Sequence, residues 1–263
     1  MRKKPSVYDL QQSKGKRQLL ELHVDDEHEA AAAEEAGIDM FTCEVDVKLP
    51  RIRAGAPYTF IQAGMKHGAV ATADEGVRKG FQALEMGADA VYFSGSPRIV
   101  EAMAAEGIPV TGHIGLVPNW STWTNYRAIG KTPEEAAKLN SRMKSLENAG
   151  AWAIEVEVVP VKIAAWLTAN TPMITEGMGC GAVCDTQYLF SSDILGTNTG
   201  HYPRHSKRYA DFAAELVRLQ AMRLNAIKAF VDDVKNNNYP ERSHEIDIDN
   251  STFERFLELV EKT

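Results

Sequence analysis

The chain has 263 residues, of which 44% are hydrophobic and 25% charged, a balance that excludes a disordered protein and allows a large core. Its net charge of -7, without a long lysine or arginine stripe, argues against a nucleic-acid binder. The 3 cysteines form no disulfide or zinc pattern, so we expect reduced thiols. No apolar run suits a signal peptide or a membrane span, so we expect a soluble, cytoplasmic protein with no membrane partner.

A unit of helix end, glycine and apolar strand recurs along the chain, as in EEAGIDMFTCEV, LEMGADAVYFSG and ENAGAWAIEVEV. Glycine suits the end of a helix because it adopts the left-handed conformation at little cost. The pattern predicts strands at 19–24, 40–45, 58–63, 90–95, 109–115, 152–158, 172–179 and 192–196. Eight such units favour an α/β fold of the (β/α)8 TIM barrel type, as a single domain, over an open doubly wound sheet.

Two helices of the predicted barrel have clear start signals. Thr132 and Glu135 form one capping box, and Thr72 and Glu75 form another. Further on, apolar residues from 206 to 236 follow a helical period, and we expect them, Met222 included, to pack into the core. The expected division is a barrel over residues 1–245 and a C-terminal helical extension over 246–263, which packs either on a neighbouring subunit or on its own barrel.

Barrels of this kind carry their chemistry at the carboxyl ends of the strands. The polar residues expected there are Glu44, Asp46, Gln62, Ser94, His113, Glu155, Glu157 and Glu176. Glu155 and Glu157 are two residues apart on one strand and therefore face the same side. If that side is the interior, burial raises the pKa of a carboxyl and suits it to proton abstraction from carbon; otherwise the pair lies solvated or ion-paired at the rim.

His113 lies between Gly112 and Gly115 in the segment PVTGHIGLVPNW. A histidine at a strand end favours contact with a substrate, although a lone histidine is more often structural. Glu44 and Asp46 are candidates for the ligands of a divalent cation, because Mg2+ takes oxygen ligands.

Six segments give the chain a specific family resemblance: GHIGLVPNW, NYRAIGKT, AGAWAIEVEVVPVKIA, EGMGCGAVCDTQYLFSSDILG, GHYPRHSKRYADF and NNNYPERSHE. The chain resembles the ketopantoate hydroxymethyltransferases, which belong to the phosphoenolpyruvate mutase and isocitrate lyase superfamily. The resemblance implies proton removal beside the carbonyl of 3-methyl-2-oxobutanoate and addition of a one-carbon unit from methylenetetrahydrofolate. It also implies Mg2+ or another divalent metal that holds the oxo acid, and a homo-oligomer.

By this resemblance Glu157 is the general base and His113 contacts the substrate. The chain departs from the family pattern elsewhere in the site. The two metal-binding aspartates fall at or beside Val45 and at Gln62, and the Lys-x-Glu motif of the fourth strand becomes Tyr92 and Ser94. Substrate anchoring must therefore differ, and the expected substrate contacts are Glu44, Asp46, Gln62, Tyr92 and Ser94.

Three functions follow from this pattern. The first is a hydroxymethyltransferase-like enzyme that forms the enolate of a small 2-oxo acid and transfers a one-carbon group. The second is a C-C bond lyase or isomerase of the same superfamily. The third is a non-catalytic barrel that binds a small acid or a partner protein.

Overall fold

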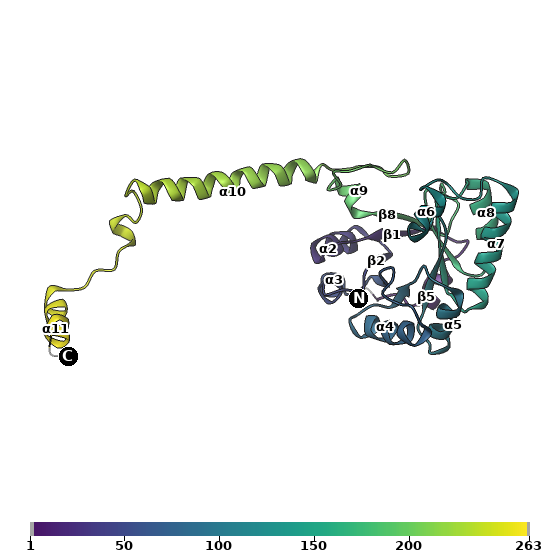
Figure 1. The fold of residues 1–263 in the computed structure, drawn as a ribbon, viewed down its shortest axis with the longest axis horizontal. Helices are drawn as coiled ribbons and strands as arrows, with labels where there is room; N and C mark the ends of the chain where they lie inside the picture. The colour runs from purple at the N-terminus through teal and green to yellow at the C-terminus, as the bar shows by residue number, and fades with distance from the viewer. Residues whose placement is uncertain (1–2, 262–263) are drawn as a thin grey trace. The chain divides into compact units, whose positions relative to one another are not determined.

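The computed structural model describes residues 3–261 and contains a closed barrel of parallel strands that pair in chain order (Figure 1). The strands are β1 (Leu19–His23), β2 (Met40–Glu44), β3 (Phe60–Gly64), β4 (Ala90–Tyr92), β5 (Val110–Gly115), β6 (Ala153–Glu157), β7 (Ile174–Met178) and β8 (Thr186–Phe190). Pairing of β8 with both β7 and β1 closes the barrel. The predicted (β/α)8 fold is confirmed.

Helices surround the strands and cover the outside of the barrel (Figure 1). They are α1 (Val7–Gln11), α2 (Glu27–Ala36), α3 (Leu49–Gly55), α4 (Ala73–Glu85), α5 (Pro97–Ala105), η1 (Pro118–Trp120), α6 (Ser121–Thr124), α7 (Pro133–Asn148), α8 (Val161–Ala169) and α9 (Ser191–Leu195). Thr72 and Thr132 cap α4 and α7, since each side chain accepts a hydrogen bond from the backbone three residues later. The predicted capping box forms at Thr72, whereas at α7 the Glu135 carboxylate accepts from the backbone of Gly130 and Lys131 and not from that of Thr132.

The eighth strand lies earlier in the chain than predicted. Residues 192–196 were expected to form it, but residues 191–195 form the short helix α9, and the strand is Thr186–Phe190. The prediction was wrong because it assumed a helix between every pair of strands. Only residues 179–185 connect β7 to β8, and they contain no helix.

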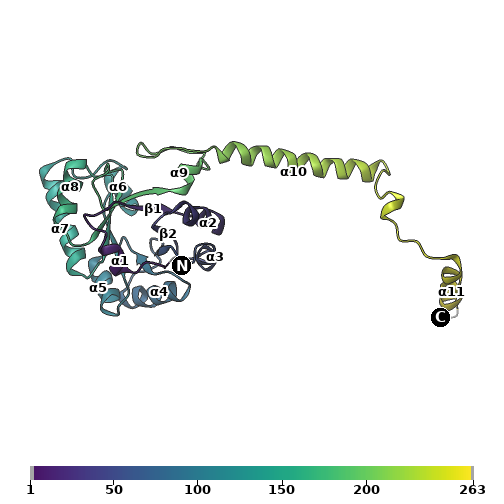
Figure 2. The same cartoon turned by 180° about the vertical axis from the view of Figure 1, so that it is seen from behind.

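Two layers fill the barrel from its amino end upward. An apolar layer comes first, in which Leu10 of α1 packs with residues at the strand starts; α1 lies against the barrel in Figure 2. That layer also contains Leu19, Met40, Phe60, Ala90, Trp152, Ala153 and Ile174. One step along the strands, the side chains of Glu21, Gln62 and Glu176 form a buried polar layer. Among residues 3–261 these two layers fill the amino end of the barrel, and the strands' carboxyl ends line a cavity.

A second compact unit begins at Phe212, after the barrel unit ends at Asp211. It contains α10 (Phe212–Lys235), η2 (Arg242–His244) and α11 (Asn250–Val260). Within this unit neither α10 nor α11 has a buried residue, and Met222 is 53% exposed there. That the apolar face of residues 206–236 packs into the core therefore stays a prediction. This unit boundary precedes the expected division after residue 245, which stays a prediction. None of the described helices is long and apolar enough to cross a membrane.

Candidate active site

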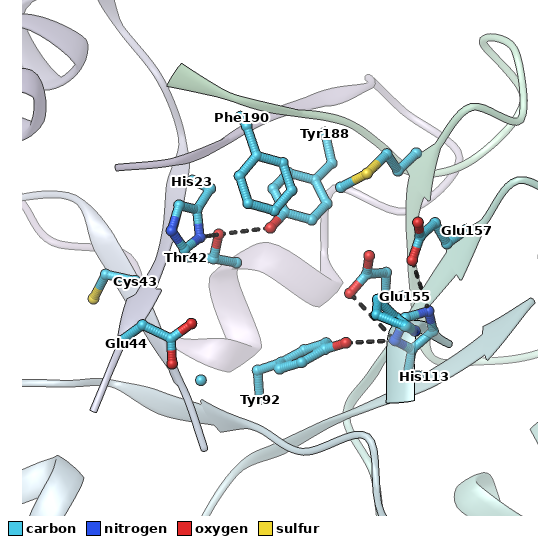
Figure 3. Close-up of a pocket in the computed structure, with 13 residues that line it drawn as sticks. His23, Thr42, Cys43, Glu44, Tyr92, His113, Glu155, Glu157, Tyr188 and Phe190 are labelled. Carbon is cyan, nitrogen blue, oxygen red and sulfur yellow. Dashed lines mark hydrogen bonds and ion pairs between the residues drawn. The ribbon is translucent and has the colours of Figure 1, made fainter. Parts of the chain in front are cut away.

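A cavity of about 260 Å³ opens at the carboxyl ends of the strands (Figure 3). The residues that line it come from strands around the barrel and from the segment after β5. They are His23, Thr42, Cys43, Glu44, Gly64, Tyr92, His113, Pro118, Glu155, Glu157, Met178, Tyr188 and Phe190. Both acids of β6 and His113 therefore share one site.

His113 and the two acids of β6 form a compact cluster. The register of β5 and β6 pairs His113 with Glu155 and Gly115 with Glu157. The Nε2 atom of His113 lies 3.3 Å from Oε2 of Glu157, and its Nδ1 lies 3.8 Å from Oε2 of Glu155. Both acids thus face the interior, and Glu157 lies at the rim while Glu155 lies deeper.

Gly115 allows the ends of β5 and β6 to approach closely. Its φ is +94°, and a Cβ atom added there would lie 2.1 Å from the backbone oxygen of Glu157. Leu116 N also donates a hydrogen bond of 2.8 Å to that oxygen. Only glycine fits this position without moving the backbone that carries Glu157.

Burial changes the protonation of this cluster. It raises the pKa of Glu157 to about 8 and that of Glu155 to about 7, because an ionised carboxylate is poorly solvated in the interior. The side chain of Glu157 is still 13% exposed. Burial lowers the pKa of His113, whose side chain is 1% exposed, so the imidazole is neutral near pH 7. The site therefore pairs a carboxyl of high proton affinity with a neutral ring.

Tyr92 completes the cluster from the end of β4. Its hydroxyl is hydrogen-bonded to Nδ1 of His113. Burial raises the pKa of Tyr92 well above its usual value, so the side chain stays a hydroxyl. Nε2 of His113 has no hydrogen-bond partner in the described chain, although Glu157 lies close to it.

Gln62 lies in the polar layer and is not a lining residue of the cavity. Its amide nitrogen donates to Glu21 at 2.6 Å and to Glu176 at 2.8 Å, and its amide oxygen accepts from Thr111 at 2.6 Å. It is fully buried. Burial also raises the pKa of Glu21 to about 8. The side chain of Gln62 is therefore committed to the barrel interior, and Glu176 lies in the same layer.

The other predicted site residues separate in space. Glu44 lines both the cavity and a smaller neighbouring cavity. Ser94 lines only the smaller one, where its hydroxyl accepts a hydrogen bond of 2.8 Å from Asn119. Asp46 is exposed and accepts a hydrogen bond from the backbone of Lys48, at the start of α3. Glu44 and Asp46 thus do not act as a pair.

Sequence reasoning missed one wall of the cavity, formed by His23, Thr42, Tyr188 and Phe190. The rings of His23 and Phe190 stack with centroids 4.6 Å apart, and those of Tyr188 and Phe190 with centroids 5.8 Å apart. The Tyr188 hydroxyl is hydrogen-bonded to Thr42. His23 lies near the end of the strand predicted at 19–24 and could have been found from that position. Misplacement of the eighth strand hid Tyr188 and Phe190.

The sequence profile of ketopantoate hydroxymethyltransferases matches residues 43–242. The chain belongs to the ketopantoate hydroxymethyltransferase family. It is 34% identical over 253 residues to the 3-methyl-2-oxobutanoate hydroxymethyltransferase of Kosmotoga olearia, which covers 87% of this chain and 92% of that protein. It is also 34% identical over 216 residues to 3-methyl-2-oxobutanoate hydroxymethyltransferase 1 of Methylibium petroleiphilum, covering 80% and 71%. Its relatives are thus transferases, as predicted.

Solved structures of low sequence identity share the fold. A putative phosphonomutase from Burkholderia cenocepacia has a TM-score of 0.55 and 11% identity, covering 88% of this chain and 98% of that one. A phosphonopyruvate hydrolase solved with oxalate and Mg2+ has a TM-score of 0.53 and 11% identity, covering 98% of both chains. A 2,3-dimethylmalate lyase of the PEP mutase/isocitrate lyase superfamily has a TM-score of 0.50 and 12% identity, covering 91% and 88%.

Val45 and Gln62, which the family resemblance places at the metal positions, offer no carboxylate to a divalent ion. Val45 is apolar and packs against the core, and the amide of Gln62 is hydrogen-bonded inside the barrel. His113, Glu155 and Glu157 each offer one ligand atom within 4.8 Å of the others. Mg2+ prefers an all-oxygen set, and Nδ1 of His113 is already hydrogen-bonded to Tyr92, so this cluster is a poor match for Mg2+.

Proposed function

We propose that this protein forms an enolate from a small carbonyl compound, with Glu157 as the general base, and adds a one-carbon unit to it. One observation carries the proposal: Glu157 lies at the rim of the cavity, where burial raises the pKa of its carboxyl to about 8. A base with that proton affinity is well matched to a weakly acidic C-H bond near neutral pH. Family membership supports the same reaction type.

The cluster supports a simple assignment of protons. If Nδ1-H of His113 donates to the Tyr92 oxygen, the Tyr92 hydroxyl, which also faces Glu155, can donate to the carbonyl oxygen of the substrate. Glu157 then takes the proton from the neighbouring carbon, and the electron pair of that C-H bond forms the enolate. The protonated Glu157 can donate to Nε2 of His113, which lies 3.3 Å away and lacks a hydrogen bond before the step.

Addition of the one-carbon unit would follow from attack by the enolate carbon on an electrophilic carbon. The family resemblance favours methylenetetrahydrofolate as its donor and a small 2-oxo acid as the starting substrate class. In the family a divalent ion supplies positive charge to the enolate; here Tyr92 would supply a hydrogen bond to the same oxygen. Glu44 and Ser94 remain proposed substrate contacts. Family membership also supports a cytoplasmic location and a homo-oligomer, and both stay part of the proposal.

Hydrogen exchange tests the proposed base. The protein is incubated in deuterated buffer with 2-oxo acids and related ketones, with and without Mg2+, and loss of the hydrogen beside the carbonyl is followed by NMR. We expect the wild type to catalyse exchange and the exchange rate of Glu157→Gln to be lower by about 100-fold or more, which is about the contribution of a positioned general base. Glu155→Gln is the matched control, because it removes the deeper acid of the same strand face.

The outcomes separate the candidate functions. If exchange survives in Glu157→Gln but is lost in Glu155→Gln, the base is Glu155 and not Glu157. No exchange with any carbonyl compound rejects the proposal and favours a non-catalytic binding barrel. Cleavage of a branched hydroxy acid without added folate favours the C-C lyase instead.

A further inference from the structure

A third cavity, the α7 cavity, lies between the outer face of β5 and helix α7. Its volume is about 250 Å³, and its lining comes from the end of β5, from the segment that follows β5 and from α7. A Cβ atom added to Gly112 would lie 2.9 Å from Leu146 of α7, so Gly112 and Ile114 face α7 while His113 between them faces the barrel interior. Within the described chain, His113 alone lines both the α7 cavity and the main one.

Most of the α7 cavity is lined by apolar side chains. Ile114 and Leu139 are buried, and Ile129 packs against the same core cluster. Trp120 also contributes to the lining, and its side chain is 43% exposed. Burial of carbon surface against such a lining is favourable, so the cavity suits a ligand with an apolar body.

Arg142 of α7 places a positive charge without a counter-ion in this lining. The side chain is half-buried, and among residues 3–261 the guanidinium forms one hydrogen bond, from Nη2 to the backbone oxygen of Gly95. Its Nε is buried and has no acceptor, and its Cζ lies 5.7 Å from the centre of the Trp120 ring. Burial lowers the pKa of Arg142, and no described carboxylate acts against that shift. A half-buried cation of this kind is stabilised when an anion pairs with it.

The other two charged side chains of the α7 cavity do not oppose an anion. The carboxylate of Glu135 already accepts hydrogen bonds from the guanidinium of Arg127 and from two backbone N–H groups. Lys138 is exposed and lies four residues before Arg142, so both cations lie on the same face of α7. An anion that enters the cavity therefore meets two cations, whereas the charge of the acid is already compensated.

We propose that the α7 cavity is a separate binding site for a small carboxylic acid, whose carboxylate pairs with Arg142 and whose apolar body lies against Ile129 and Leu139. Guanidinium and carboxylate form strong, charge-assisted hydrogen bonds, which suits this pairing. An inorganic anion such as phosphate would leave the apolar lining unfilled. The inference concerns a different cavity from the one that contains Glu157, and it does not rest on the proposed enolate chemistry.

Two probes of nearly equal shape test the charge of the ligand. They are 4-methylpentanoate and its neutral amide, 4-methylpentanamide, and each is titrated into the full chain by calorimetry at pH 7. We expect the acid to bind at least about tenfold more tightly than the amide, because hydrogen bonds to a charged group are the stronger ones. Acetate and inorganic phosphate lack the apolar body and should each bind at least about tenfold more weakly than 4-methylpentanoate.

NMR of methyl-labelled protein locates the bound acid. Protons of 4-methylpentanoate should show contacts with the methyl groups of Ile129 and Leu139, which line the α7 cavity. Contacts with the methyl group of Met178, which lines the main cavity, in place of these two would overturn the inference.

Three variants identify the groups responsible. Arg142→Met removes the charge and keeps an unbranched side chain, so it should weaken 4-methylpentanoate to the affinity of the amide and leave the amide unchanged. Lys138→Gln, at an exposed position, should weaken the acid about twofold to fivefold. Arg98→Met, which changes an exposed arginine of α5 outside the cavity, should alter neither probe. Thermal unfolding checks that each variant keeps the fold.

Several outcomes overturn the inference. Equal affinity for the acid and the amide does so in the wild type alone, even if Arg142→Met fails to fold. A preference for the acid that survives Arg142→Met removes the proposed partner of the carboxylate. Phosphate that binds as tightly as 4-methylpentanoate excludes an apolar acid as the ligand class, and absence of binding by any of the four probes excludes the site.

Discussion

The pH dependence of hydrogen exchange follows directly from the burial of Glu157. Because burial raises its pKa from 4.5 to about 8, its ionised fraction is only about 1% at pH 6 and about 50% at pH 8. Only the ionised carboxylate can accept a proton from carbon. The enzymatic exchange rate should therefore rise about 50-fold between pH 6 and pH 8 and then level off. An unburied glutamate of ordinary pKa would give a flat profile over this interval.

The assay measures deuterium loss from an α-deuterated ketone in ordinary water, so that no solvent isotope effect shifts the titration. The exchange rate measured with the Glu157→Gln variant is subtracted at each pH to remove exchange that the buffer catalyses. Glu155→Gln should keep the same shape of profile, because Glu157 remains. A wild-type profile that is flat from pH 6 to pH 8 would refute the reasoning, since it would mean that the base is an ordinary, solvated group.

Three further predictions concern stability and use urea unfolding. Burial raises the pKa of Glu176 well above 4.5 in the folded state, so the unfolded chain releases this proton at lower pH than the folded protein does. The free energy of unfolding of the wild type should therefore decline as the pH rises above 4.5. In Glu176→Gln this free energy should fall less between pH 5 and pH 9 than in the wild type. Equal declines would contradict this. Gly115→Ala should lower the free energy of unfolding by at least about 2 kcal/mol, because φ at this position is +94° and the added Cβ would contact the Glu157 backbone. A decrease below about 0.5 kcal/mol would show that β5 and β6 can separate freely. Thr132→Ala should lower the free energy of unfolding by about 1 kcal/mol through loss of the α7 cap, whereas Thr132→Ser should change it little. Similar decreases for the two variants would argue against the cap.

The family resemblance predicts Glu157 as the base and His113 as a substrate contact, and the structure brings their side chains within 3.3 Å of each other. The same resemblance places the family's metal ligands at Val45 and Gln62. In this chain Gln62 is hydrogen-bonded within the barrel and Val45 packs against the core.

Local signals in the sequence were sufficient for the barrel and for part of the site. Repeated units of helix, glycine and strand predicted seven of the eight strands in approximately the right places, and the caps at Thr72 and Thr132 are correct. Glu155 and Glu157 were correctly assigned to one strand face, because side-chain direction along a strand alternates with period two. Each of these features depends on residues that are close together in the chain.

Closure of the barrel decided the rest. It determined that Gln62 contacts Glu21 and Glu176 inside the barrel and does not line the cavity. It also determined that Glu44 reaches the cavity while Asp46 accepts a hydrogen bond from the Lys48 backbone, and that β8 supplies Tyr188 and Phe190 as an aromatic wall. These contacts join residues far apart in the chain, such as Thr42 and Tyr188. Pairing of β1 with both β2 and β8 brings such residues together, and the pattern within one strand does not identify which strands become its neighbours. The sequence alone therefore determined the barrel and its candidate base, whereas the tertiary structure determined the charge and shape of the cavity around that base.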